Sequence, residues 1–294
     1  MFETVTRQKS KLRMGLVGTS GSGKTLGALY IAYGITADWS KIALIDTEHE
    51  RGRFYANRTD LEIPTGSFMY QSLTAPYSPE KYIAYVQEAA AAVGPDGVII
   101  VDSFSHAWDN EGGVLDIKNE IAKTQKNGNS FSAWDEAGKV QNNLINAVLS
   151  VNAHTIVTMR AKMAYAMETD ERGKTRPVKI GLAPVQRENA EYEFDIVMNI
   201  GRDHTAVTSK DTTFLDTFSG VITPEIGKQL HEWLDNGVEP ERCSDCGTII
   251  TAAKGRTVQQ IAEGTLKAYG RKLCMKCVAA ELKKRKEAAN NAPA

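Results

Sequence analysis

Residues 18–25 form a complete phosphate-binding loop, and this motif constrains the fold more than any other part of the 294-residue chain. The loop reads G-x-x-x-x-G-K-T and consists of Gly18, Thr19, Ser20, Gly21, Ser22, Gly23, Lys24 and Thr25. Its glycines let backbone N–H groups face phosphate oxygens, its lysine neutralises the β/γ charge, and its threonine hydroxyl can bind Mg²⁺. An apolar run precedes the loop at 14–17 and a helix-like stretch follows at 26–33. Because the motif requires this strand-loop-helix context, the sequence predicts a nucleoside triphosphate site.

Apolar runs alternate with helical patterns along the first 200 residues. Strands are predicted at 14–17, 42–45, 98–101, 155–159 and 196–200, and helices at 79–93 and 133–151. Strands separated by helices indicate an α/β fold, with a mostly parallel central sheet and helices on both faces. In such sheets the ligand binds at the carboxyl ends of the strands, so the residues that follow each strand are candidates for the site.

Carboxylates follow two of these strands. Asp102 ends the run at 98–101 and is the expected partner of Thr25 in holding Mg²⁺, although such an acid can also be only a strand terminus. Ser103 follows it in place of a second acid, so a carboxylate that activates water must come from elsewhere. Glu48, after the strand at 42–45, is one candidate, and a solvated loop acid is the alternative interpretation.

The segment Ile-Asp-Thr-Glu-His at 45–49, with Glu48 placed 24 residues after Lys24, resembles the strand of RecA-type recombinases that carries their catalytic glutamate. Residues 99–103 are similar to the Walker B strand of that family, and the similarity extends over 10–205. Residues 181–187 and 192–195 resemble short RecA-core ATPases of bacteriophages that act in single-strand annealing and recombination. The resemblance implies a RecA-like core over 1–235, ATP as the nucleotide and Glu48 as the catalytic base.

Two segments that follow strands, 104–132 and 160–187, are longer than simple connections. In the second, residues 163–167 and 175–180 flank a polar turn as in a β-hairpin. The corresponding loops of RecA-type proteins contact single-stranded DNA, which implies DNA contacts for Lys162, Tyr165, Arg172, Lys174 and Arg176. Basic side chains would neutralise phosphates and Tyr165 would stack on a base, whereas the alternative is a solvated hairpin. Arg160, Lys162 or Arg187 could also serve as an arginine finger, and we favour Arg187.

All four cysteines lie in two C-x-x-C pairs near the end of the chain: Cys243 with Cys246, and Cys274 with Cys277. Four thiolates suit Zn²⁺, so we expect a zinc-binding module over 236–294, with an Fe–S cluster, a redox pair or unliganded thiols as alternatives. The 27 residues between the pairs exceed the usual spacing of a zinc ribbon, and 257–268 has a helical pattern. Residues 239–294 carry 11 Lys and Arg against 6 Asp and Glu, a basic surface suited to nucleic acid, while protein contact or simple scaffolding is the alternative.

Net charge and hydrophobicity limit the classes of protein that remain. The formal net charge is −1 and no apolar run reaches 18 residues, which favours a soluble cytoplasmic protein, in the host cytoplasm if phage-encoded, without a membrane partner. The leading hypothesis is a Mg²⁺-dependent ATPase that binds single-stranded DNA and assists recombination, annealing or replication. Its expected partners are that DNA, a single-strand-binding or recombination protein, and further copies of the chain.

Two other function classes remain open. One is a nucleotide-dependent adaptor that recruits a protein through the cysteine module, and the other is a phosphate-loop enzyme acting on a small molecule. A guanine-nucleotide switch is disfavoured, because Asp102 does not begin an Asp-x-x-Gly element and no Asn-Lys-x-Asp element is present.

Overall fold

A computed structural model describes residues 6–124, 130–169 and 175–290 of the chain. The chain divides into two units, Lys11–Trp233 and a smaller one that combines Met1–Ser10 with Leu234–Ala294. The division falls within helix α6 (Pro224–Asp235), close to the limit at residue 235 that the sequence indicated. The residues before Lys11 belong with the smaller unit, which the sequence did not indicate.

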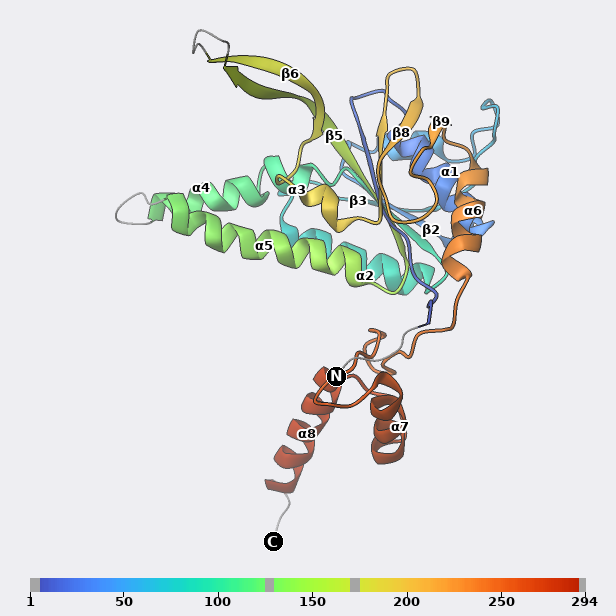
Figure 1. Ribbon diagram of the computed structural model, residues 1–294, viewed down its shortest axis with the longest axis vertical. Coiled ribbons are helices and arrows are strands. Elements are labelled where there is room, and N and C mark those ends of the chain that lie inside the picture. The colour runs from blue at the N-terminus through green and yellow to red at the C-terminus, as the bar shows by residue number, and fades with distance from the viewer. Residues whose placement is uncertain (1–5, 125–129, 170–174, 291–294) are drawn as a thin grey trace. The chain divides into compact units, whose positions relative to one another are not determined.

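The larger unit is built on a sheet with the strand order β3-β2-β4-β5-β1-β7-β8-β9, in which β6 pairs with β5 (Figure 1). Neighbours from β3 to β7 are parallel, whereas β8 and β9 are antiparallel additions at one edge. The mostly parallel sheet with flanking helices is therefore confirmed. The strands are β1 (Arg13–Gly18), β2 (Ile42–Asp46), β3 (Met69–Ser72), β4 (Val98–Asp102), β5 (His154–Thr169), β6 (Thr175–Pro184), β7 (Ile196–Ile200), β8 (Thr205–Asp211) and β9 (Ser219–Val221).

The central strands are continuous apolar runs because helices cover both faces of the sheet. Every residue of β2 and of β4 is buried, as expected for parallel strands enclosed on both sides. The register places Asp46 opposite Asp102 and Gly18 opposite Arg160, and β5 lies between β1 and β4. The carboxyl ends of β1, β5, β4 and β2 therefore form one row.

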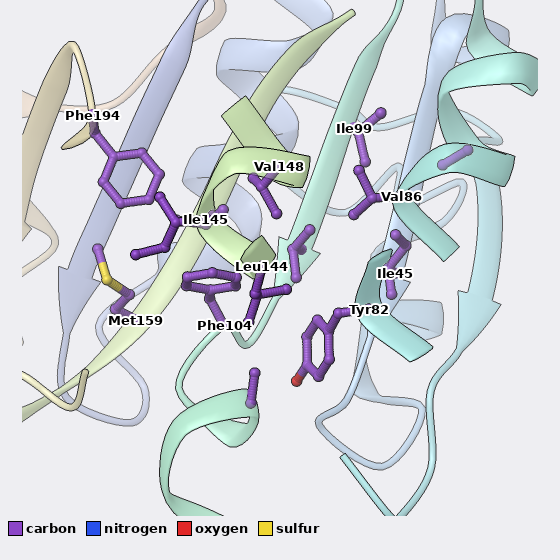
Figure 2. Close-up of a cluster of buried hydrophobic side chains, with 14 of the residues drawn as sticks. Ile45, Tyr82, Val86, Ile99, Phe104, Leu144, Ile145, Val148, Met159 and Phe194 are labelled. Atoms are coloured by element: carbon purple, nitrogen blue, oxygen red, sulfur yellow. The ribbon is translucent and has the colours of Figure 1, made fainter. Parts of the chain in front are cut away.

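Helices α2 (Pro79–Val93) and α5 (Ser130–Ser150) pack on one face of this sheet. Figure 2 shows their side chains, among them Tyr82, Val86 and Leu144, meeting Ile45 and Ile99 from the strands. Ser78 caps the start of α2, and its hydroxyl accepts a hydrogen bond from the Lys81 backbone N–H.

On the opposite face, α1 (Lys24–Thr36) contacts β1, β2, β4 and β5. Helix α6 crosses α1 at glycines, because a Cβ atom on Gly34 would lie 1.9 Å from the Pro224 carbonyl oxygen.

The two long segments after strands differ from each other in structure. Residues 104–132 were expected to be an extended loop, but they contain α3 (His106–Asp109) and α4 (Val114–Thr124), which packs against α5. The missed signal is the helical spacing of Val114, Ile117 and Ile121. In the second segment the expected hairpin is present: β5 continues past the sheet and pairs antiparallel with β6, forming a two-stranded arm (Figure 1).

Short 3₁₀ turns complete the larger unit: η1 (Trp39–Lys41), η2 (Arg51–Tyr55) and η3 (Ala190–Glu193). The smaller unit contains α7 (Val258–Tyr269) and α8 (Met275–Asn290) around a small core that includes Ile250, Ile261 and Leu273. Thr257 and Gln260 form a reciprocal capping box at the start of α7, near the predicted helix start at 257. Within the described residues, no helix combines the length and the apolar character needed to cross a membrane.

Candidate functional site

The phosphate-binding loop joins the end of β1 to the start of α1, so α1 directs its amino-terminal N–H groups toward the loop. Gly21 and Gly23 have φ values of 78° and 91°, a region that L side chains rarely adopt. Lys24 Nζ donates hydrogen bonds to the carbonyl oxygens of Gly18 and Thr19, each at 2.9 Å. Burial lowers the pKa of Lys24, and the negative charges of Asp102 and Glu48 oppose that shift.

Asp102 lies directly beside the loop threonine. Thr25 Oγ1 donates to Asp102 Oδ2 at 2.5 Å, and Thr158 Oγ1 on β5 donates to Asp102 Oδ1 at 2.5 Å. Asp102 is only 3% exposed, and burial raises its pKa, helped by the nearby charges of Glu48 and Asp46, against the two hydroxyl hydrogen bonds. A buried carboxylate that is hydrogen-bonded to a threonine hydroxyl suits a divalent cation, because the cation would offset the cost of the buried negative charge.

Asp46, the last residue of β2, shapes the turn that carries Glu48. Its Oδ1 accepts the Glu48 N–H at 2.6 Å, and its Oδ2 accepts the Gly52 N–H and the Tyr70 hydroxyl, each at 2.9 Å. Burial, together with the hydrogen bond to Asp46, raises the pKa of Tyr70 to about 12. Asp46 is therefore occupied in fixing the backbone, which leaves Glu48 as the carboxylate of this turn that faces the strand ends.

Glu48 makes a bidentate ion pair with Arg160, the β5 residue that lies opposite Gly18. Arg160 Nε donates to Glu48 Oε1 at 2.9 Å, and Arg160 Nη2 donates to Oε2 at 2.7 Å. Burial by itself raises the pKa of Glu48, but the hydrogen bonds and charge of Arg160 outweigh it, so the pKa lies below its usual value. The carboxylate is thus ionised near neutral pH and held by a partner that the sequence did not assign to it.

The sequence-predicted residues do not all come together. Lys24, Thr25, Glu48 and Asp102 gather at the row of strand ends, and their mutual electrostatic influence reflects this proximity. Arg187 lies elsewhere: it is exposed, and its Nη1 donates to Asn142 Oδ1 on α5 at 3.0 Å. Among the described residues of one chain, Arg160 is the arginine beside Glu48.

Three of the predicted DNA contacts, Lys162, Tyr165 and Arg176, lie on the β5–β6 arm. Lys162 is exposed on β5. Tyr165 and Arg176 lie on β5 and β6, with side chains outside the described part of the structure. Arg172 and Lys174 fall outside the described residues, and their DNA contacts stay a prediction.

A pocket of about 370 Å³ opens beside the loop, and no pattern in the sequence indicated it. Its walls come from α1, from the 55–62 region and from β7 to β9, and they include Tyr30, Tyr55, Ile200, His204 and Ile222 together with Gly21 and Gly23 of the loop. A largely apolar pocket that touches the phosphate loop suits a nucleobase. Its residues are scattered along the chain, so only the fold brings them together.

The four cysteines gather within the smaller unit. One sulfur atom from each of Cys243, Cys246, Cys274 and Cys277 lies within 4.8 Å of all the others, and Cys246 Sγ is 3.7 Å from Cys274 Sγ. Zn–S bonds of about 2.3 Å in a tetrahedron imply sulfur separations of about 3.8 Å, so the cluster fits a zinc ion. Gly247, with φ of 70°, turns the first knuckle, and its N–H donates to the Cys243 carbonyl oxygen.

Sequence comparison supports the nucleotide site. A model of the AAA domain family AAA_24 matches residues 10–228, which span the phosphate loop, Glu48, Asp102 and the β5–β6 arm. A search of curated proteins finds no match to the chain.

Proposed function

Because this chain belongs to the AAA domain family AAA_24, whose members carry an ATPase-type domain, we propose that it is a Mg²⁺-dependent ATPase of RecA-like type that binds single-stranded DNA. The observation that carries the proposal is the contact between Thr25 and Asp102 beside Lys24, at the carboxyl ends of β1 and β4. This group of side chains suits the terminal phosphates of ATP and one Mg²⁺ ion. Recombination, annealing or replication is the setting that the RecA resemblance favours.

In the proposed reaction each residue has one role. Lys24 would exchange the loop carbonyl oxygens for the β/γ phosphates, and Thr25 and Asp102 would hold Mg²⁺. When bound, Mg²⁺ supplies neutralisation of the charge that develops on the phosphate oxygens. Glu48 accepts a proton from the attacking water. To do so, its carboxylate must release Arg160 and form a hydrogen bond to that water instead. Among the described residues, Arg160 is the arginine beside Glu48 and is the proposed arginine finger within one chain, whereas Arg187 is proposed to act on a neighbouring copy.

The arm provides the proposed link to DNA. Arg160 lies on β5 at the point where this strand leaves the sheet and enters the arm. A movement of the arm can therefore reach Glu48 through Arg160, because both belong to or contact the same strand. We propose that single-stranded DNA along the arm shifts Arg160 and thereby raises the rate of hydrolysis. Zinc in the four-cysteine cluster would cross-link the smaller unit, whose basic surface is a second proposed contact for nucleic acid.

One experiment tests the proposal: hydrolysis of ATP by the full chain, with and without single-stranded DNA and with and without Mg²⁺. We expect DNA to raise kcat, and Glu48→Gln to lower it by about 10²-fold or more with ATP affinity retained. Glu50→Gln is the matched control, because Glu50 is an exposed acid two residues away and should not alter kcat. A rate that is independent of DNA, together with no salt-dependent DNA binding, would exclude the DNA part of the proposal while leaving the ATPase intact.

A further inference from the structure

His106 is a buried histidine next to Glu48 to which the proposed reaction gives no role. It is the first residue of α3, just past the end of β4, and is 1% exposed. Its ring packs against the Tyr77 ring with centroids 5.0 Å apart. Its Nδ1 lies 2.8 Å from the hydroxyl oxygen of Thr47, the residue immediately before Glu48. His106 is thus fixed to the turn that carries Glu48.

The hydrogen bonds of Thr47 favour one of the two neutral tautomers of His106. Thr47 Oγ1 accepts the Ser103 backbone N–H at 2.8 Å, so its own proton is free to be donated. His106 Nδ1 at 2.8 Å is a better acceptor position than the Ser103 carbonyl oxygen at 3.3 Å. With Nδ1 accepting, the neutral ring must carry its proton on Nε2.

This Nε2–H has no hydrogen-bond partner and faces the Glu48 carboxylate. Among the described side chains, His106 Nε2 is buried without a partner, and it lies 3.8 Å from Glu48 Oε1. The gap exceeds a normal N–H···O distance of about 2.9 Å by about 1 Å, which a small rotation of the Glu48 side chain can close. A buried donor without a partner is costly, so closing the gap is favourable.

We propose that His106 is a positioning residue for Glu48: its Nε2–H takes the carboxylate when Arg160 releases it and holds it at the strand ends. The inference rests on the proposed function, in which Glu48 must leave Arg160. This exchange requires that Arg160 can leave Glu48 while His106 stays in place. The Arg160 side chain is 43% exposed and able to move, whereas His106 is buried. Burial and the Arg160 charge also keep the pKa of His106 low, against the opposing charge of Glu48, so the ring stays neutral at pH 7.

The first test uses two variants that separate the ring nitrogens. The Gln amide nitrogen reaches the position of Nε2, whereas the Asn amide reaches only that of Nδ1. We expect His106→Asn to lower kcat about tenfold or more with little change in KM for ATP, and His106→Gln to restore most of the rate. His49→Asn is the matched control, because His49 is exposed and its φ of 55° suits asparagine.

Two further measurements separate this proposal from a purely structural role. In a Glu48→Gln background, His106→Asn should cause no additional loss of rate, since the group it positions is already absent. Independently of activity, ¹⁵N NMR of the nucleotide-free protein should show His106 as the neutral Nε2–H tautomer, with a resonance that shifts in Glu48→Ala.

An Nδ1–H tautomer, or a His106→Asn rate equal to wild type while Glu48→Gln is inactive, would overturn this inference alone. Absence of hydrolysis by the wild-type protein would overturn both proposals.

Discussion

At the residue scale, Asp102 combines its proposed role in holding Mg²⁺ with a cost to the fold. A carboxyl group whose pKa is raised on folding is penalised when ionised, so the penalty is present above that pKa and disappears as pH falls. We therefore expect Asp102→Asn to raise the urea midpoint of the nucleotide-free protein at pH 7.5, by an amount that shrinks as the pH falls through the raised pKa of Asp102. The same change should weaken Mg²⁺-dependent ATP binding by more than about tenfold.

The exposed carboxylate of Asp135 on α5 provides the control for this prediction. Asp135→Asn should change neither the urea midpoint nor ATP binding. A lower midpoint for Asp102→Asn at pH 7.5 would show that the hydroxyl hydrogen bonds from Thr25 and Thr158 outweigh the penalty of burial.

A site residue could be predicted from the sequence where a local motif marks its role. It could not be predicted where its contacts depend on the order of the strands in the sheet. Lys24 and Thr25 belong to a contiguous loop, and Asp102 ends an apolar run, so spacing alone indicates them. The contacts of Arg160 and Thr158 with site carboxylates follow from the insertion of β5 between β1 and β4, and the contact of His106 with Glu48 follows from the pairing of β2 with β4. No pattern in a single sequence specifies that insertion.

At the element scale, the close crossing of α1 and α6 depends on two glycines. A Cβ on Gly34 would lie 1.9 Å from the Pro224 carbonyl oxygen, and one on Gly227 would lie 2.1 Å from the Ile31 carbonyl oxygen. Because both obstacles are backbone atoms, the helices must separate to admit a methyl group. We expect Gly34→Ala to lower the free energy of unfolding by about 1–3 kcal/mol, measured by urea titration of tryptophan fluorescence.

Gly138, within α5, is the matched control for this crossing. A Cβ there meets only the Arg187 guanidinium at 3.8 Å or more, which is ordinary contact. Gly138→Ala should therefore raise stability by roughly 0.5–1 kcal/mol through helix propensity. Equal effects of the two substitutions would contradict the tight crossing.

Helices and strands were predicted correctly where the sequence pattern is typical of one kind of secondary structure. Residues 163–167 and 175–180, which flank a polar turn, indicated the β5–β6 hairpin, and the antiparallel pairing of β5 with β6 confirms it. Helix α4 was not predicted, although Val114, Ile117 and Ile121 recur at helical spacing and the helix packs against α5. A charged segment with a narrow apolar stripe is a surface helix before it is a loop.

At the scale of the whole molecule, the two units are expected to respond differently to loss of zinc. The smaller unit has a small core, and about 10–16 kcal/mol of binding energy at a structural zinc site commonly supports the folding of such a module. Its cysteine cluster belongs to that unit alone, and the sheet of the larger unit has a large core of its own. Metal removal should therefore unfold α7 and α8 and leave the ATPase-type unit folded.

The tryptophans make this separation measurable, because all four, Trp39, Trp108, Trp134 and Trp233, lie in Lys11–Trp233. A strong chelator, or Cys274→Ser, should reduce helical ellipticity while the thermal transition seen by tryptophan fluorescence stays within about 2 °C of its original midpoint. Ser244→Ala, beside the first cysteine, should keep one equivalent of zinc and the full ellipticity. If chelation instead moved the tryptophan transition and the ellipticity together, the smaller unit would be part of the stability of the larger one, and the zinc cluster would support the nucleotide site as well as its own module.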